Sequence, residues 1–126
     1  MVYRVINLVY RSPNMTPEQF RHHYETVHAP LAVECTDPRN APLSYTRRYV
    51  VDTGARPRGI AAPDFDCIAE LTFRDEATWL RYLEGLTTGE NGKRIAEDSL
   101  IFQRAAEAKL SAMELEETTV LSAETS

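Results

Sequence analysis

Residues 15–31 read MTPEQFRHHYETVHAPL, and this stretch holds the strongest structural signal in the chain. Thr16 is a suitable N-cap, the proline after it fits the first helical position, and Gln19 follows three residues after the cap, as in a capping box. The pattern predicts a helix that begins here and runs to about Val27. Pro30 disfavours helical geometry at the residue before it, so we expect the helix to end there.

The segments on both sides of this helix carry strand patterns and a second helix pattern. Runs rich in Val, Ile, Leu and Tyr predict strands, and apolar residues spaced three and four apart predict helices. In order, we expect strands at 3–11, 43–51 and 64–73, a helix at 74–86, a shorter helical piece at 93–102 and a last strand at 109–120.

This order, β-α-β-β-α-β, predicts an α+β fold of the ferredoxin-like type. A four-stranded antiparallel sheet would carry the helices on one face only. The open apolar face would be buried against a second copy of the sheet, which predicts a homodimer with a barrel-like interior, a dimeric α/β barrel. We expect a single domain over residues 1–121 and a C-terminal tail at 122–126.

Composition narrows the class of protein. The 126 residues are 43% hydrophobic and carry a formal net charge of −5. An acidic chain with scattered basic residues argues against nucleic-acid or membrane partners. The first segment is too short and too polar for a signal peptide or a membrane span, so we expect a cytoplasmic protein. Cys35 and Cys67 fit no zinc spacing, which predicts reduced thiols.

Three histidines fall within seven residues of the first helix. Phe20, Tyr24 and His28 are four apart and share one helical stripe, whereas His22 and His23 point elsewhere. His28 is therefore the candidate for acid–base chemistry, and Tyr24 for substrate contact. The alternative for His28 is a structural histidine that braces the turn before Pro30.

Strand alternation supplies candidate partners. In the third strand, Cys67, Ala69 and Leu71 share the face expected to pack on the helices, whereas Asp66 and Glu70 share the face expected to line the dimer cavity. A buried carboxylate is costly unless it is paired or protonated. We therefore expect Glu70 either to transfer protons, as a catalytic residue, or to pair with Arg47 or Arg48, and Asp66 to bind substrate.

In the second strand, Tyr45, Arg47 and Tyr49 share one face and Arg48 the other. If the first set lines the cavity, its phenols and guanidinium suit a planar, hydroxylated and carboxylated substrate. If the strand faces the other way, Arg48 takes that place. Asn7, among hydrophobic neighbours in the first strand, is a further substrate-binding candidate.

Two motifs resemble the EthD family. YRSPNMTPEQFRHHYETVHAPLA, at 10–32, carries an Arg-x-Pro turn, a Thr-Pro-Glu helix start and His-Ala-Pro-Leu, and FDCIAELTFRDEATWLRYL, at 65–83, is similar to the family's third strand and second helix. The resemblance implies a dimeric α/β barrel with one cavity per subunit and no metal or organic cofactor. Fungal members look like small decarboxylases, dehydratases and cyclases of aromatic polyketide pathways. Others are accessory proteins of oxidative degradation.

We therefore expect a cofactor-independent lyase or cyclase acting on an aromatic polyketide-like intermediate in secondary metabolism, with His28 as general acid/base. The reaction would be decarboxylation, dehydration or aldol cyclisation. The alternatives are a binding or accessory protein that holds a small aromatic molecule unchanged, and a purely structural dimer module. We expect no metal, because the histidines lack the i, i+4 spacing of a helical site. Some dimeric α/β barrels carry haem, but no residue here singles it out.

Overall fold

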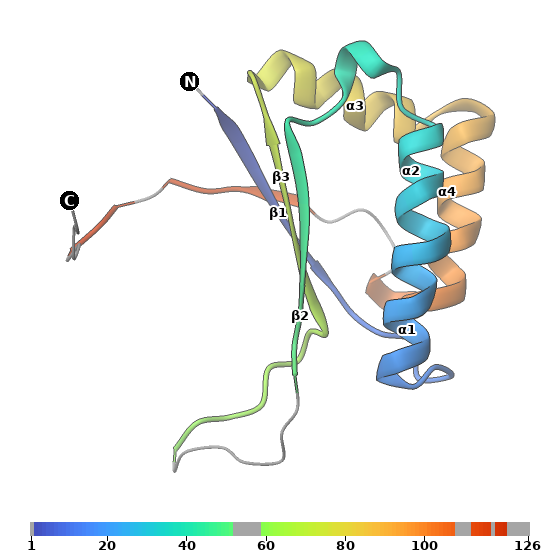
Figure 1. The fold of residues 1–126 in the computed structure, drawn as a ribbon, viewed down its shortest axis with the longest axis vertical. Coiled ribbons are helices and arrows are strands. Elements are labelled where there is room, and N and C mark those ends of the chain that lie inside the picture. Colours follow the sequence, from blue (N-terminus) through green and yellow to red (C-terminus); the bar gives the residue numbers. More distant parts are fainter. Residues whose placement is uncertain (1, 52–58, 108–111, 117, 121–126) are drawn as a thin grey trace.

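The computed structural model describes residues 2–51, 59–107, 112–116 and 118–120. Four strands form an antiparallel sheet in the order β2-β3-β1-β4. They are β1 (Tyr3–Val9), β2 (Ser44–Tyr49), β3 (Cys67–Phe73) and β4 (Ala112–Glu114). Helices cover one face of this sheet (Figure 1). The predicted α+β class with an antiparallel sheet and helices is confirmed.

The last strand differs from its predicted extent. β4 is three residues long, whereas residues 109–120 were expected to be a strand. Its register places Ala112 opposite Asn7. Positions 109–111 and 117, and the predicted tail at 122–126, lie outside the described residues.

Side chains alternate along β3 in the way the sequence predicted, and they alternate along β1 as well. Cys67, Ala69 and Leu71 are buried against the helices, and the residues between them face the other side. Antiparallel pairing sets Asn7 opposite Ala69, so the Asn7 side chain also faces the helices.

The predicted start of the first helix is confirmed atom by atom. The Thr16 hydroxyl accepts from the Gln19 backbone N–H at 3.1 Å, and Gln19 Oε1 accepts from the Thr16 N–H at 2.9 Å. These two bonds satisfy donors that have no partner inside the helix. The helix α1 (Pro17–His23) begins directly after this cap.

The predicted end of this helix is wrong. The chain remains helical beyond α1, through a π-helical turn η1 (Tyr24–His28) and then α2 (Ala29–Glu34). In η1 the Ala29 N–H bonds to the Tyr24 carbonyl, five residues back. In a regular α-helix the ring of Pro30 would clash with the carbonyl four residues earlier, and the missing N–H would leave that carbonyl unpaired. The wider π turn accommodates the proline without ending the helix.

Two further helices complete the layer. The helix α3 (Glu76–Thr87) is capped by Asp75, whose carboxylate accepts from the Thr78 N–H at 2.8 Å. The helix α4 (Gly89–Phe102) begins four residues earlier than residue 93, where the sequence predicted it. Gly92 permits this tight connection, since a Cβ there would lie 2.6 Å from the carbonyl carbon of Thr87.

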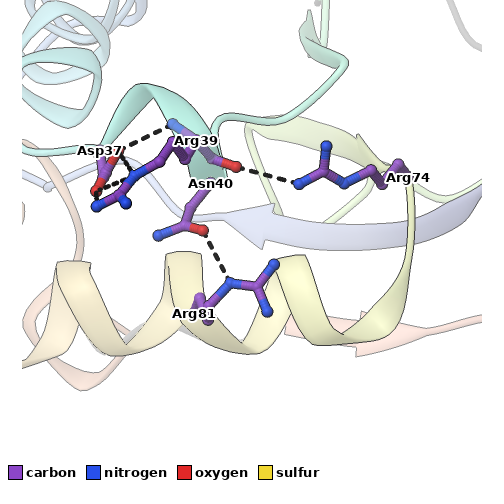
Figure 2. Close-up of polar contacts among 5 residues, drawn as sticks. All are labelled: Asp37, Arg39, Asn40, Arg74 and Arg81. Atoms are coloured by element: carbon purple, nitrogen blue, oxygen red, sulfur yellow. Dashed lines mark hydrogen bonds and ion pairs between the residues drawn. The ribbon is translucent and has the colours of Figure 1, made fainter.

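A short 3-10 turn, η2 (Pro38–Asn40), is tied to the end of β3 and to α3 (Figure 2). Arg81 Nε donates to the Asn40 side chain at 2.9 Å, and Arg74 donates to the Arg39 carbonyl at 3.4 Å. The proline-containing loop after α2 is thereby fixed at one end of the helix layer. A second short 3-10 turn, η3 (Ala105–Glu107), follows α4.

The core lies between the sheet and the helices in two clusters. One gathers around Trp79 and Phe73, and the other around Phe20, Tyr24 and Phe102. Cys35 and Cys67 are buried free thiols.

In the described part of the chain, no helix is long and apolar enough to cross a membrane.

Candidate active site

A cavity of about 470 Å³ lies between the helix layer and the helix-facing side of the sheet. Most of its wall is apolar and aromatic, with Leu71, Trp79 and Leu86 among the lining residues. Its polar lining side chains include Asn7, Tyr24, His28, Tyr45, Tyr82 and Gln103. This cavity lies on the helix side of the sheet, whereas the chamber that the sequence analysis expected would lie on the opposite face, between two sheets.

His28, the last residue of η1, is 8% exposed and lines this cavity. Its Nδ1 lies 2.8 Å from Oδ2 of Asp98, a buried residue of α4. Among the described residues, no hydrogen bond involves Nε2 of His28. Burial lowers the pKa of His28 below its usual value, although Asp98 acts in the opposite direction. The imidazole is therefore neutral at pH 7, as a general base must be.

A second histidine binds the same carboxylate. His23 Nε2 lies 2.9 Å from Asp98 Oδ1, so the two oxygens of Asp98 each face one imidazole. Residues five apart in a regular α-helix point about 140° away from each other. The π turn between His23 and His28 adds one residue to the turn and brings both rings to one side. The prediction that His23 points elsewhere is wrong for this reason.

Phe102, fully buried at the end of α4, packs against both imidazoles. Its ring centroid lies 4.7 Å from that of His28 and 5.2 Å from that of His23. The two histidines are thus held by ring packing as well as by Asp98.

Two phenols meet beside His28. The hydroxyls of Tyr24 and Tyr45 are 2.6 Å apart. Burial raises the pKa of Tyr45 to about 12 and raises that of Tyr24 well above its usual value, so both phenols keep their protons at neutral pH. When Tyr24 donates to Tyr45, the Tyr45 O–H remains available as a donor at the cavity wall.

Four of the predicted site residues therefore come together: Asn7, Tyr24, His28 and Tyr45 line one cavity. Arg47 and Tyr49 face the helices and not the open face of the sheet, where the predicted dimer cavity would lie, and they do not line the cavity. Arg48 lies on the open face with Glu70, as the second strand orientation required. Arg47 Nε donates to Glu25 Oε2 at 2.6 Å and its Nη2 donates to Oε1 at 2.8 Å, while the Tyr49 hydroxyl donates to the same carboxylate.

Glu70 and Asp66 do not meet His28. They project from the opposite face of the sheet, because the helix-facing positions of β3 are the odd-numbered ones. Glu70 forms ion pairs with Arg48 at 3.3 Å and with Arg4 at 3.6 Å. Asp66 accepts from the Arg11 N–H at 2.8 Å. The expectation that these carboxylates share a chamber with His28 is wrong, since the cavity lies on the other side of the sheet.

Sequence reasoning missed Asp98, which is the direct partner of His28. A signal was present: Ile95, Asp98, Ser99 and Phe102 follow helical spacing, so two polar residues stand at positions of the buried stripe of α4. A polar side chain at such a position needs a buried partner.

In the described part of the chain, no group of three or more His, Cys, Asp or Glu residues is arranged to hold a metal ion.

The model of the EthD domain matches residues 12–100, which include His23, His28 and Asp98. The chain belongs to the EthD domain family. The matched range covers the first helical segment, β2, β3, α3 and most of α4, which line the cavity together with β1 and the chain after α4. No curated protein matches the chain significantly.

Solved structures share the fold, among them two of EthD-type proteins. An EthD family protein from Bacillus halodurans superposes with a TM-score of 0.59 at 23% identity, covering 94% of this chain and 100% of its own. An EthD-like protein from Ralstonia eutropha gives 0.59 at 12% identity, over 95% of this chain and 93% of its own. A hypothetical protein from Arabidopsis thaliana gives 0.58 at 14% identity, over 94% of this chain and 90% of its own. At these identities the likeness concerns the fold alone.

Proposed function

We propose that this EthD-domain protein is a cofactor-independent lyase or cyclase that acts on an aromatic polyketide-like intermediate of secondary metabolism. The observation that carries the proposal is a neutral, buried His28 in the wall of a largely apolar cavity, with a carboxylate behind it. A volume of about 470 Å³ lies in the range of small-molecule sites.

His28 acts first as a base in this proposal. Nε2 removes a proton from the carbon beside a ketone, which leaves an enolate in the substrate and an imidazolium on the protein. In a cyclisation, the enolate carbon attacks a second carbonyl and the resulting alkoxide takes the proton back from His28. In a dehydration, the enolate expels a β-hydroxyl group, which receives the same proton and leaves as water. The lowered pKa of His28 favours these two reactions over decarboxylation, which begins with a protonated imidazole.

Hydrogen-bond donors stabilise the enolate oxygen. The Tyr45 hydroxyl and the Asn7 amide line the same cavity as His28. Both are neutral donors in a site with apolar walls, where such bonds are stronger than in water. Aromatic walls, with Trp79 and Tyr82 among them, would stack on a planar ring system.

The assembly belongs to the proposal as well. We propose a ferredoxin-like protomer that pairs through its open sheet face into a homodimeric α/β barrel, and a cytoplasmic location remains a prediction. The face of the sheet turned away from the helices carries Ile6, Leu8 and Ile68, each only half-buried in the single chain. A second copy of the sheet would cover them.

The second candidate function is binding without turnover. It is supported by the cavity wall, whose apolar residues would hold a small aromatic molecule without chemistry. In that case the protein would be an accessory component of an oxidative pathway.

A direct assay separates the two functions. The protein is incubated with a panel of aromatic β-hydroxy ketones, poly-β-ketones and β-keto acids, and products are followed by mass spectrometry for loss of water, loss of CO₂ or cyclisation. We expect turnover that falls at least about 100-fold in His28→Gln, the range of general acid–base catalysis. His22→Gln is the matched control, because His22 is exposed on the same helix. Full turnover in His28→Gln would refute the catalytic role, and binding of the panel without any product would favour the accessory function.

A further inference from the structure

Asp98 lies between two spaces that the chain keeps separate. On one side His28 lines the inner cavity, and on the other His23 lines a shallow groove on the outer surface of the helix layer. The groove is also lined by Glu18, His22 and Thr26. The side chains of Asp98, His28 and His23 are 9%, 11% and 15% exposed, so all three are largely buried and His23 is the most exposed.

We propose that Asp98 and His23 are positioning residues for His28: Asp98 fixes the ring so that Nε2 serves the cavity, and the charge on His23, which faces the outer groove, acts on His28 through the shared carboxylate. This inference rests on the proposed role of His28 as the proton-transferring group. It adds Asp98 and His23 to that site, and it adds a way in which the basicity of His28 is regulated.

The role of Asp98 follows from matching hydrogen-bond donors with acceptors. An ionised carboxylate only accepts, so each imidazole nitrogen that faces it must carry a proton. His28 then holds its proton on Nδ1 and has its lone pair on Nε2, and His23 holds a proton on Nε2. The tautomer of His28 that can act as a base in the cavity is therefore selected by Asp98. When Nε2 takes up a substrate proton, the same carboxylate balances the new positive charge.

The role of His23 follows from its place. When its second nitrogen takes up a proton, a positive charge arises on the imidazole ring beside the other oxygen of Asp98. That charge competes for the carboxylate and disfavours a second positive charge on His28, so it lowers the pKa of His28. The other titratable groups that line the cavity with His28 are phenols that stay protonated at neutral pH, namely Tyr24 of η1, Tyr45 of β2 and Tyr82 of α3.

The test needs no substrate. Imidazole ¹⁵N NMR reports the tautomer and the pKa of each histidine, and with three histidines in the chain His22→Gln assigns the spectrum and serves as the control. In the wild type we expect His28 as the Nδ1–H tautomer. In Asp98→Asn an amide replaces the carboxylate and only its oxygen can accept, so the two imidazoles can no longer both donate. At least one of them then reverses its tautomer, and the pKa of His28 falls by about one unit.

His23→Gln tests the second residue separately. We expect the pKa of His28 to rise by about one unit while its Nδ1–H tautomer is kept, because the competing charge is gone. In any assay that detects turnover, the acid limb of the pH profile should move to higher pH together with the pKa of His28. His22→Gln should change neither this pKa nor the pH profile. An unchanged His28 tautomer and pKa in Asp98→Asn, or an unchanged or lowered His28 pKa in His23→Gln, would overturn the inference. The NMR result stands whether or not a substrate is turned over, so failure of the catalytic proposal is seen separately.

Discussion

Glu25 forms hydrogen bonds with Arg47 and Tyr49, the two residues of β2 that the sequence analysis predicted to bind substrate. Its carboxylate receives two bonds from the Arg47 guanidinium and one from the Tyr49 hydroxyl, so the charge of Arg47 is already balanced inside the protein. These bonds lower the pKa of Glu25 to about 2. Arg47 and Tyr49 therefore fasten β2 to the first helical segment next to the cavity.

The Glu25 cluster predicts a pH-dependent contribution to stability. The folded pKa of Glu25 is lower than its value in the unfolded chain, so its contribution is complete above about pH 4.5 and is lost as the pH falls towards 2. Glu25→Gln should lower the free energy of unfolding by about 1 kcal/mol at pH 7, since the pair is partly exposed and screened. Urea unfolding at pH 7 and pH 3 should show the gap between variant and wild type closing at the lower pH.

Glu18→Gln, on the exposed surface of the same helix, is the control and should change stability less. A gap between Glu25→Gln and the wild type that stays constant with pH would contradict the assignment.

At the scale of the element, the π turn explains why the predicted end of the first helix and the predicted direction of His23 were wrong. It lets Pro30 stand inside a continuous helical segment, and it turns His23 and His28 to the same carboxylate. Such turns recur at functional sites in helices.

Deleting Val27 tests the link between the turn and the proline. Val27 is 43% exposed, so its own contacts matter little. The deletion would restore regular α-helical spacing and place the proline inside an α-helix, at a cost of about 3 kcal/mol. We expect chemical denaturation to show this loss, and to show its recovery when Pro30→Ala is combined with the deletion. A deletion variant as stable as the wild type would show that the proline does not need the wider turn.

The sequence predicted those parts of the fold that depend on local patterns. Strand alternation placed Cys67, Ala69 and Leu71 on the helix side, and the capping residues located the start of α1. The site was predicted only in part, because it depends on where the cavity lies. Placing the chamber between two sheets assigned Glu70 to it, whereas the structure puts it on the helix side with Asp98. Proline rules alone predicted an end before Pro30, because they take no account of a π turn, which is rare in helices.

At the scale of the molecule, the helices leave one face of the sheet open, among the described residues (Figure 1). β3 lies between β2 and β1, so Ile68 stands near the middle of that face. Arg4, Arg48 and Glu70 form ion pairs around it.

Ile68→Glu tests whether this face pairs two chains. We expect the wild type to sediment as a dimer and the variant as a monomer, because a buried unpaired carboxylate opposes association. Ile101→Glu is the control, since Ile101 is exposed on α4 in the helix layer. A wild-type monomer, or a dimer that survives Ile68→Glu, would argue against the sheet interface.

The cavity is walled by side chains of one polypeptide, on the side of the sheet away from the open face. A substitution on the open face is therefore separated from the cavity by the thickness of the sheet. An engineer could then alter the pairing of chains and the shape of the pocket independently.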